Sequence, residues 1–406
     1  MMSKKSPQLR FEGFTDDWEE RKLGDVGNTF TGLTGKTKED FGHGSAKFVT
    51  YVNVFQNPIA TLDQLDAIEI DEKQNQVQKG DIFFTTSSET PEEVGMSSVW
   101  THDTENVYLN SFTFGYRPRV SFDLNYMASM LRSPSIRKKI TFLAQGISRY
   151  NISKTKMLEI EIPTPTLSEQ EKIGSFFKQL DNTIALHQRK LDLLKEQKKG
   201  YLQKMFPKNG AKVPELRFAG FADDWELRKL NEVSDIYDGT HQTPKYQDDG
   251  VMFLSVENIK TLTSNKFISR EAFEVEFKIR PQRGDVLMTR IGDIGTANVV
   301  ETDEDLAYYV SLALFKSEEL NPYFLQASIY APFVQDQIWK RTLHIAFPKK
   351  INKNEIGQVP INVPTLAEQT KIGSFFKQLD NTITLHQRKL DLLKEQKKGF
   401  LQKMFV

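Results

Sequence analysis

The sequence predicts an α+β protein with a pseudo-two-fold internal repeat, in which two mixed domains alternate with two long helices. Residues 172–206 and 371–405 are identical at 33 of 35 positions, at an offset of 199. A shorter block, residues 7–26, matches residues 214–233 at 14 of 20 positions. Agreement of this kind indicates an internal duplication, so each half opens with one shared block and closes with another.

The longer repeat predicts a coiled-coil helix, because its apolar residues recur at alternating steps of four and three. The predicted seam residues are Ile173, Phe177, Leu180, Ile184, Leu191 and Leu194, and in the second copy Ile372, Phe376, Leu379, Ile383, Leu390 and Leu393. One such helix, roughly 50 Å long, cannot bury its own stripe. We therefore expect the two copies to pair as an antiparallel coiled coil; parallel pairing between two chains is the alternative. His187 and His386 fall on the same seam, where a polar residue that sets the register is the simpler interpretation than a metal ligand.

Local signals mark where the two helices begin. Thr166 and Thr365 are predicted N-caps, with Glu169 and Glu368 three residues later as in a capping box. Pro207 is expected to end the first helix. The predicted segments are 1–163 (first domain with the shared block), 164–206 (central helix), 207–213 (linker), 214–362 (second domain) and 363–406 (C-terminal helix).

The segments between the shared blocks of each half, called the middles here, differ in sequence, yet both combine short β-rich runs with a later helix. The expected strands are 47–54, 81–86, 112–116, 252–256, 285–289, 297–300 and 312–315, and the expected helices are 122–143 and 322–340. Asn53 and Asn258 each lie in a strand-like stretch. Loops rich in hydrogen-bonding side chains separate these elements, at 31–38, 85–89, 146–151, 238–246, 289–293 and 344–350. Such side chains bind base edges and phosphates, although ordinary surface turns have the same composition.

The bulk composition excludes several classes of protein. The 406 residues contain no cysteine, which excludes disulfides and cysteine-ligated zinc. No apolar run approaches the ~20 residues of a membrane span and the N-terminus lacks an apolar signal core, so we expect a cytoplasmic protein. The formal net charge is zero, which argues against a general nucleic-acid coat. Each long repeat is net +5, typical of either a phosphate-binding or a solvated helix face. Motifs of hydrolases and nucleotide-binding sites are missing, so we expect no catalysis and no metal.

Two sets of paired motifs carry a family resemblance that covers essentially the whole chain. The first is LRF–GF–DDWE–RKL, at 9–23 and 216–230, and the second is P-T-L-x-E-Q…KI-x-x-FF-x-x-LD-x-x-I, at 165–184 and 364–383. With the segments 238–246 and 284–295, this layout resembles the specificity subunit of type I restriction–modification systems.

The resemblance implies two target-recognition domains, each reading one half of a bipartite double-stranded DNA target. It implies that the helices set the distance between the half-sites and bind two modification subunits. Those partners would carry S-adenosylmethionine and methylate adenine, and restriction subunits with helicase and nuclease activity would add ATP- and Mg-dependent cleavage. The chain itself would be non-catalytic and hold no cofactor, and its partners would share the neutralisation of the DNA charge.

Candidate DNA-contacting residues are chosen by their position in the loops. They are Thr34, Lys36, Ser87, Ser88, Arg149 and Tyr150 in the first domain, and Thr240, His241, Thr243, Lys245, Tyr246 and Arg290 in the second. A competing hypothesis is a non-catalytic coiled-coil assembly protein whose globular domains bind proteins. An enzyme with an unrecognised site in the middles is the third.

Overall fold

The structure, a computed structural model, describes residues 6–208 and 210–405. Residues 1–5 of the predicted first domain, Asn209 of the predicted linker and Val406 of the predicted last segment lie outside the described residues. The chain separates into two compact units. Unit 1 comprises Met1–Gln188 with Lys389–Val406, and unit 2 comprises Arg189–Arg388. Each unit therefore combines one α+β body with a segment of each long helix.

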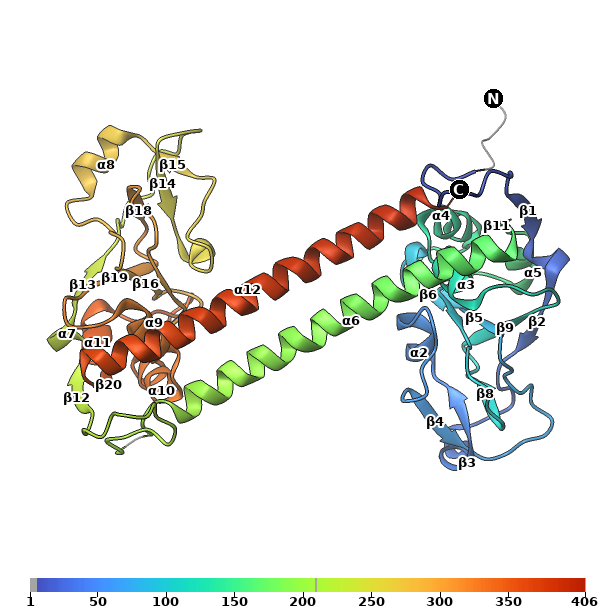
Figure 1. The fold of residues 1–406 in the computed structure, drawn as a ribbon, viewed down its shortest axis with the longest axis horizontal. Coiled ribbons are helices and arrows are strands. Elements are labelled where there is room, and N and C mark those ends of the chain that lie inside the picture. The colour runs from blue at the N-terminus through green and yellow to red at the C-terminus, as the bar shows by residue number, and fades with distance from the viewer. Residues whose placement is uncertain (1–5, 209, 406) are drawn as a thin grey trace. The chain divides into compact units, whose positions relative to one another are not determined.

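The body of unit 1 contains short strands and helices that lead into a 38-residue helix, α6 (Leu167–Lys204) (Figure 1). Its elements are β1 (Glu19–Lys22), α1 (Leu23–Val26), β2 (Gly27–Thr31), η1 (Lys38–Asp40), β3 (Phe41–Val49), α2 (Tyr51–Gln56), β4 (Leu65–Ile68), β5 (Ile82–Thr85), β6 (Ser87–Ser88), η2 (Pro91–Glu93), β7 (Ser97–Val99), β8 (Val107–Leu109), β9 (Thr113–Pro118), α3 (Leu124–Met130), α4 (Pro134–Leu143), β10 (Tyr150–Asn151), α5 (Lys154–Leu158) and β11 (Glu161–Thr164). A four-stranded sheet has the order β2-β9-β5-β7, and a three-stranded sheet the order β4-β3-β8.

The body of unit 2 repeats this architecture in a different sequence and leads into α12 (Leu366–Lys403). Its elements are β12 (Glu226–Lys229), α7 (Leu230–Val233), β13 (Asp235–Asp238), β14 (Val251–Leu254), η3 (Val256–Asn258), β15 (Phe267–Ile268), α8 (Arg270–Glu276), β16 (Val286–Thr289), β17 (Ala297–Val299), β18 (Leu306–Tyr308), β19 (Leu312–Lys316), α9 (Pro322–Tyr330), α10 (Pro332–Arg341), α11 (Lys353–Gly357) and β20 (Pro360–Val363). The sheet orders β13-β19-β16-β17 and β15-β14-β18 correspond strand for strand to those of unit 1. β12 pairs with β20 as β1 pairs with β11.

Within each unit the two long helices run antiparallel. In unit 1 the Phe176 and Phe400 rings lie 5.0 Å apart, and Asp181 pairs with Lys397. Residue numbers rise along α6 as they fall along α12, which is the antiparallel sense. Lys198 pairs with Asp380 in unit 2, so the same ion pair occurs with the roles of the two helices exchanged. The predicted fold class is confirmed: two α+β bodies, two long helices paired antiparallel, and an internal repeat.

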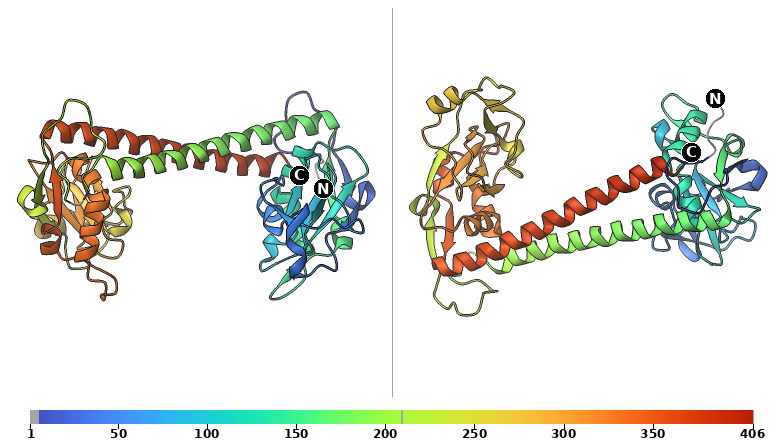
Figure 2. Two further views of the ribbon diagram at one scale, coloured as in Figure 1. Left: turned by 90° about the horizontal axis from the view of Figure 1, so that it is seen from below. Right: turned by 45° about the horizontal axis from the view of Figure 1, so that its top comes forward.

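The core of each body takes in the start of one long helix and the end of the other. In unit 1, Ile173 and Phe177 of α6 are buried together with Met404 and Phe405, which follow α12. Figures 1 and 2 show the C-terminal end of α12 beside this body. The equivalent set in unit 2 is Ile372, Phe376, Met205 and Phe206. The backbone N–H of Leu9 also donates to the Lys403 carbonyl at 2.9 Å, which satisfies one of the free carbonyls at the helix end.

All twelve predicted seam residues are buried or half-buried. Ile173, Phe177, Leu191, Leu194, Ile372, Phe376, Leu390 and Leu393 are buried. Leu180, Ile184, Leu379 and Ile383 are half-buried, as are His187 and His386.

The predicted capping box is half wrong. Thr166 does cap α6, because its Oγ1 accepts a hydrogen bond from the Glu169 N–H at 3.4 Å. The Glu169 carboxylate instead binds the Arg10 guanidinium, with contacts of 2.6 and 2.8 Å, and accepts a hydrogen bond from Trp18 Nε1 at 3.1 Å. The two shared blocks are therefore joined by a part-buried ion pair, in which Glu169 is buried and Arg10 half-buried.

Unit 2 has the equivalent arrangement. Thr365 Oγ1 accepts from the Glu368 N–H at 3.5 Å, and the Glu368 carboxylate takes both of its contacts to Arg217 at 2.7 Å. In both units the competing cation comes from the N-terminal block of the same half, 151 to 159 residues away in sequence. A local capping motif could not reveal this partner.

A glycine in each long helix permits close approach of the body. A Cβ on Gly174 would lie 2.0 Å from Asp123 Oδ1, and one on Gly373 would lie 2.4 Å from Asn321 Oδ1. Asp123 and Asn321 are themselves the N-caps of α3 and α9. The repeated Lys-Ile-Gly sequence is therefore a docking surface for these two helices.

Several expected elements have different limits. The strand expected over 47–54 ends at Val49, and α2 follows, because Thr50 Oγ1 caps it by accepting from the Asn53 N–H. Asn258 likewise lies in η3 rather than in a strand, and the strand expected over 252–256 ends at Leu254. The expected helices 122–143 and 322–340 are each two helices, broken before Pro134 and Pro332. Proline lacks the N–H that a continuing helix needs.

Candidate nucleic-acid interface

Two loops predicted separately form a single site in unit 1. Ser87–Ser88 (β6) pairs antiparallel with Tyr150–Asn151 (β10), in the register Tyr150–Ser88 and Asn151–Ser87. The N–H of Ile152 also donates to the Thr86 carbonyl at 3.0 Å. The segments 85–89 and 146–151 therefore lie side by side, next to the end of the inner strand β5.

The same two loops meet in unit 2. The N–H of Ile351 donates to the Arg290 carbonyl at 3.0 Å, and that of Gly292 to the Lys349 carbonyl at 2.8 Å. The segment 289–293 thus pairs with 344–350. In both units the fold therefore brings together two polar loops that the sequence analysis identified separately.

Not all of the candidate residues in the paired loops 85–89 and 146–151 of unit 1 face solvent. Ser87 and Ser88 are buried, and the Ser88 hydroxyl donates to Glu93 Oε2 at 3.0 Å. Arg149 is exposed and Tyr150 is half-buried. The two serines therefore hold the loop, whereas Arg149 and Tyr150 are available to a ligand.

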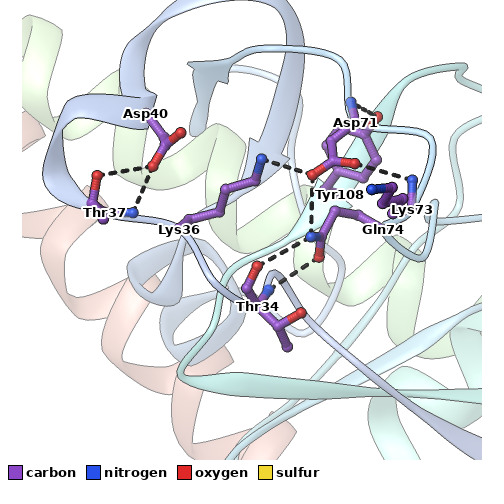
Figure 3. A network of polar contacts seen from close by, with 8 residues as sticks. All are labelled: Thr34, Lys36, Thr37, Asp40, Asp71, Lys73, Gln74 and Tyr108. Carbon is purple, nitrogen blue, oxygen red and sulfur yellow. Dashed lines mark hydrogen bonds and ion pairs between the residues drawn. The ribbon is translucent and has the colours of Figure 1, made fainter.

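A polar network holds the third candidate loop of unit 1 (Figure 3). Lys36 Nζ lies 2.8 Å from Asp71 Oδ2, and the backbone N–H and carbonyl of Thr34 bond the Gln74 amide at 3.0 and 3.1 Å. The Lys36 side chain, then the Lys73 N–H and Gln74, lower the pKa of Asp71 to about 2. Asp71 in turn raises the pKa of Lys36. Lys36 thus has an anionic partner inside the body, while the Thr34 side chain is exposed.

The loop 238–246 of unit 2 is open to solvent over most of its length. His241, Thr243 and Lys245 are exposed, and Thr240 is half-buried, with its Oγ1 donating to Glu276 Oε2 at 3.3 Å. Tyr246 is partly exposed, its ring 5.7 Å from that of Phe253. Lys266 Nζ lies over the Tyr246 ring at 5.6 Å. This loop therefore presents donors, a cation and an aromatic face.

Arg290 is engaged within its own body. Its guanidinium pairs with the Asp238 carboxylate, and its Nε donates to the Ile351 carbonyl at 3.1 Å. The side chain is buried. Because Asp238 opens the loop 238–246 and Ile351 follows 344–350, Arg290 joins all three candidate loops of unit 2 at one edge of the sheet. DNA contact by Arg290 itself stays a prediction.

The candidate list omits several apolar and basic residues in or next to the late loops, which are 146–151 in unit 1 and 344–350 in unit 2. Lys349 Nζ lies 4.9 Å from the centre of the Trp339 ring, which also packs against His344 at 4.1 Å. Ile147 in unit 1, and Ile345 and Phe347 in unit 2, are almost fully exposed. The sequence signal that could have identified these residues is an apolar residue next to a basic one within a loop.

The pairs Gly80-Asp81 and Gly284-Asp285, which come just before the inner strands β5 and β16, have a structural role. The Asp81 carboxylate accepts from the Gln78 N–H at 2.7 Å and pairs with Arg117 at 2.7 Å. Asp285 accepts from the Gln282 N–H and pairs with Lys316 in the same way. Among the residues that the structure describes, no group of three or more His, Asp or Glu side chains could hold a metal ion, and no helix is long and apolar enough to cross a membrane.

Comparison with known proteins identifies similar chains. Residues 15–196 and 222–395 match the model of the family described as "Type I restriction modification DNA specificity domain". The chain is 24% identical, over 66% of its length and 67% of the relative, to the type I restriction enzyme MjaVIII specificity subunit of Methanocaldococcus jannaschii. It is 23% identical, over 95% of its length and 92% of the relative, to the putative type I restriction enzyme MjaX specificity subunit of the same organism.

Solved structures share the fold. The S subunit of a type I restriction–modification system from M. genitalium superimposes with a TM-score of 0.66, at 15% identity, over 99% of both chains. A chain from a study of complex assembly and conformational transition of the type I R-M system gives a TM-score of 0.55 at 18% identity, over 95% of this chain and 96% of that one.

Proposed function

Because the chain belongs to the type I restriction–modification DNA specificity family, we propose that each of its two bodies reads one half of a bipartite double-stranded DNA target. The observation that carries the proposal is the identical strand order of two bodies whose loops differ at most positions in sequence. A common scaffold with different loops suits two different half-sites. As a specificity subunit the chain supplies recognition, and catalysis belongs to its partners.

The exposed loop residues are the proposed DNA contacts. Six of the candidates are exposed, and the half-buried Tyr150, next to Arg149, is grouped with them: Thr34, Arg149, Tyr150, His241, Thr243, Lys245 and Tyr246. Arginine, lysine and histidine would bind phosphates or guanine, and tyrosine rings would pack on bases or sugars. The remaining candidates, Lys36, Ser87, Ser88, Thr240 and Arg290, bond within the bodies and would hold the loops in position.

The long helices are the proposed docking surface for two modification subunits. Leu186 and Leu385 are equivalent exposed residues of the two helices, as are Leu193 and Leu392. An apolar surface repeated in an identical sequence suits two copies of one partner. Those subunits would bring S-adenosylmethionine, and restriction subunits that join them would use ATP and Mg. Helices roughly 50 Å long would hold half-sites about one DNA turn apart.

Mapping of N6-methyladenine across the genome tests this function. We expect one bipartite motif to be methylated in cells that contain this gene and to lose its methylation when the gene is deleted. Co-purification of a methyltransferase subunit would establish that the system is assembled. An assembled complex whose deletion leaves methylation unchanged would contradict the proposal. The competing hypothesis, that the chain is a coiled-coil assembly protein, predicts no sequence-dependent DNA footprint, even with partners bound.

Replacement of one body tests the assignment of half-sites. Residues 234–360 exclude both shared blocks and both long helices. Exchange of this segment for the corresponding segment of another family member should change one half of the methylated motif and leave the other half intact. A change in both halves would show that the two bodies do not read independently.

A further inference from the structure

Both late loops carry large apolar side chains at their tips in full contact with solvent. Ile147 is 95% exposed in unit 1, and Ile345 and Phe347 are 100% and 104% exposed in unit 2. Isolated apolar residues are common on protein surfaces, but full exposure of two of them on one loop is not. In the left view of Figure 2 the orange segment that contains residues 343–350 projects from the body of unit 2 as a narrow hairpin.

Backbone hydrogen bonds join the two arms of each hairpin below its tip. In unit 1 the N–H of Gln145 donates to the Asn151 carbonyl at 2.9 Å, and the N–H of Asn151 donates back at 2.8 Å. In unit 2 the N–H of Leu343 donates to the Lys350 carbonyl at 2.8 Å. The adjoining loop 85–89 pairs with the arms of the first hairpin, and the loop 289–293 with those of the second. The apolar tip is therefore carried on a supported hairpin next to the proposed DNA contacts.

The charge carried by the two tip segments themselves favours one kind of partner. Neither 144–152 (AQGISRYNI) nor 342–352 (TLHIAFPKKIN) contains an acidic residue, and both contain cations, Arg149 in the first and Lys349 and Lys350 in the second. An apolar tip flanked by positive charge is complementary to a surface that is anionic outside and apolar inside. Duplex DNA has this arrangement, with phosphates along the backbone and stacked bases between them.

We propose that Ile147 in unit 1, and Ile345 with Phe347 in unit 2, are wedges that insert into the base stack of the half-site read by their own body. The inference rests on the proposed function, because it requires that these loops face DNA. The flanking cations would hold the two backbones while the apolar side chains separate neighbouring bases. Separation of one base step would also lower the cost of extruding a nearby adenine for methylation.

Base-by-base fluorescence of the assembled complex tests the wedges. The probe is a duplex of the methylated motif with 2-aminopurine at one position at a time, excluding the methylated adenines, and the protein is the full chain with its modification subunits. We expect one position in each half-site to become fluorescent on binding. The double variant Ile345→Ser/Phe347→Ser should abolish that signal in the unit 2 half-site only and weaken binding about tenfold or more, since stacked side chains contribute strongly to binding.

Matched variants separate the wedge from general effects. Ile147→Ser should abolish the signal in the unit 1 half-site only. Val275→Ser changes an exposed apolar residue that belongs to α8 of unit 2 and to none of the candidate loops, and should leave both signals and the affinity unchanged. All three changes are on the surface, so the melting temperature should stay that of the wild type.

The outcomes distinguish the two proposals. Half-site-selective binding without any fluorescent step, or with a step that survives the double variant, would overturn the wedge and leave the proposed function standing. Loss of the modification subunits from the double variant during purification would also overturn it, because the tips would then be a protein contact. Absence of half-site-selective binding by the wild-type complex would overturn the proposed function itself.

Discussion

Units 1 and 2 share one fold, yet they build it with different side chains. Arg137 donates to the Gly95 carbonyl at 2.7 Å, whereas Gln335 donates to the equivalent Gly295 carbonyl at 2.9 Å. Arg132 donates to the Ser97 carbonyl, whereas the Tyr330 hydroxyl donates to that of Ala297. The fold sets which backbone groups need a partner, and any side chain with a donor at that place can supply it. This freedom allows the bodies to diverge while the helices stay nearly identical.

The largest expected effect comes from the ion pair that joins the shared blocks. Glu169→Gln leaves Arg10 without its anion and should lower the free energy of unfolding by about 3 kcal/mol. Glu368→Gln should cost about 1 kcal/mol less, because only Glu169 also accepts from a tryptophan. Urea unfolding of each variant, followed by tryptophan fluorescence, measures the difference. The exposed Glu171→Gln is the control, and equal losses for Glu169 and Glu368 would remove the distinction between the units.

Arg290 tests a contact that only unit 2 contains. Arg290→Met should lower the free energy of unfolding by about 2 kcal/mol, because the Ile351 carbonyl and Asp238 lose a charged donor. Its counterpart Thr86→Val in unit 1 removes one neutral hydrogen bond, to the Phe112 carbonyl, and should cost about 1 kcal/mol. Thermal unfolding compares the two. A fully stable Arg290→Met protein that loses DNA binding would favour direct DNA contact over loop positioning.

The helix glycines test a feature that the units have in common. Gly174→Ala and Gly373→Ala should each lower the free energy of unfolding by about 1–3 kcal/mol, because the new methyl group meets the cap of α3 or α9. Gly200 and Gly399, in the same helices, have open space at this position. Gly200→Ala should therefore stabilise by about 0.5–1 kcal/mol through its better helix propensity. Denaturant titrations would contradict the docking role if all the substitutions stabilised the protein.

The smallest expected effect is the pH dependence that Asp71 contributes to the stability of unit 1. The folded pKa of Asp71, about 2, is below its usual 3.8, so its stabilising effect is complete above pH 3.8 and is lost as the pH falls towards 2. The carboxyl signal of Asp71 in an NMR titration should follow this lowered value. Lys36→Met should return the pKa towards 3.8. An Asp71 pKa that is the same with and without Lys36 would show that the Lys36–Asp71 ion pair of Figure 3 does not form in solution.

The long-range contacts of the site could not be predicted from local patterns. Glu169 was assigned to a capping box because the local spacing fits, but a guanidinium 159 residues away in sequence binds its carboxylate instead. The candidate loops were found from their composition, whereas the burial of Ser87, Ser88 and Arg290 depends on pairings across the sheet. The breaks at Pro134 and Pro332 are a different kind of error, because proline is a local signal that the apolar pattern concealed.

The sequence by itself determined the duplication, the long helices with their seam, and the alternation of bodies and helices. These features follow from the local spacing of apolar residues and from comparison of one half of the chain with the other. Neither requires knowledge of distant contacts. Only the tertiary structure decided that each body encloses the start of one helix and the end of the other, and that two separate loops form one edge. Such pairings depend on which buried surfaces fit together in three dimensions, and the linear order of residues does not display that fit.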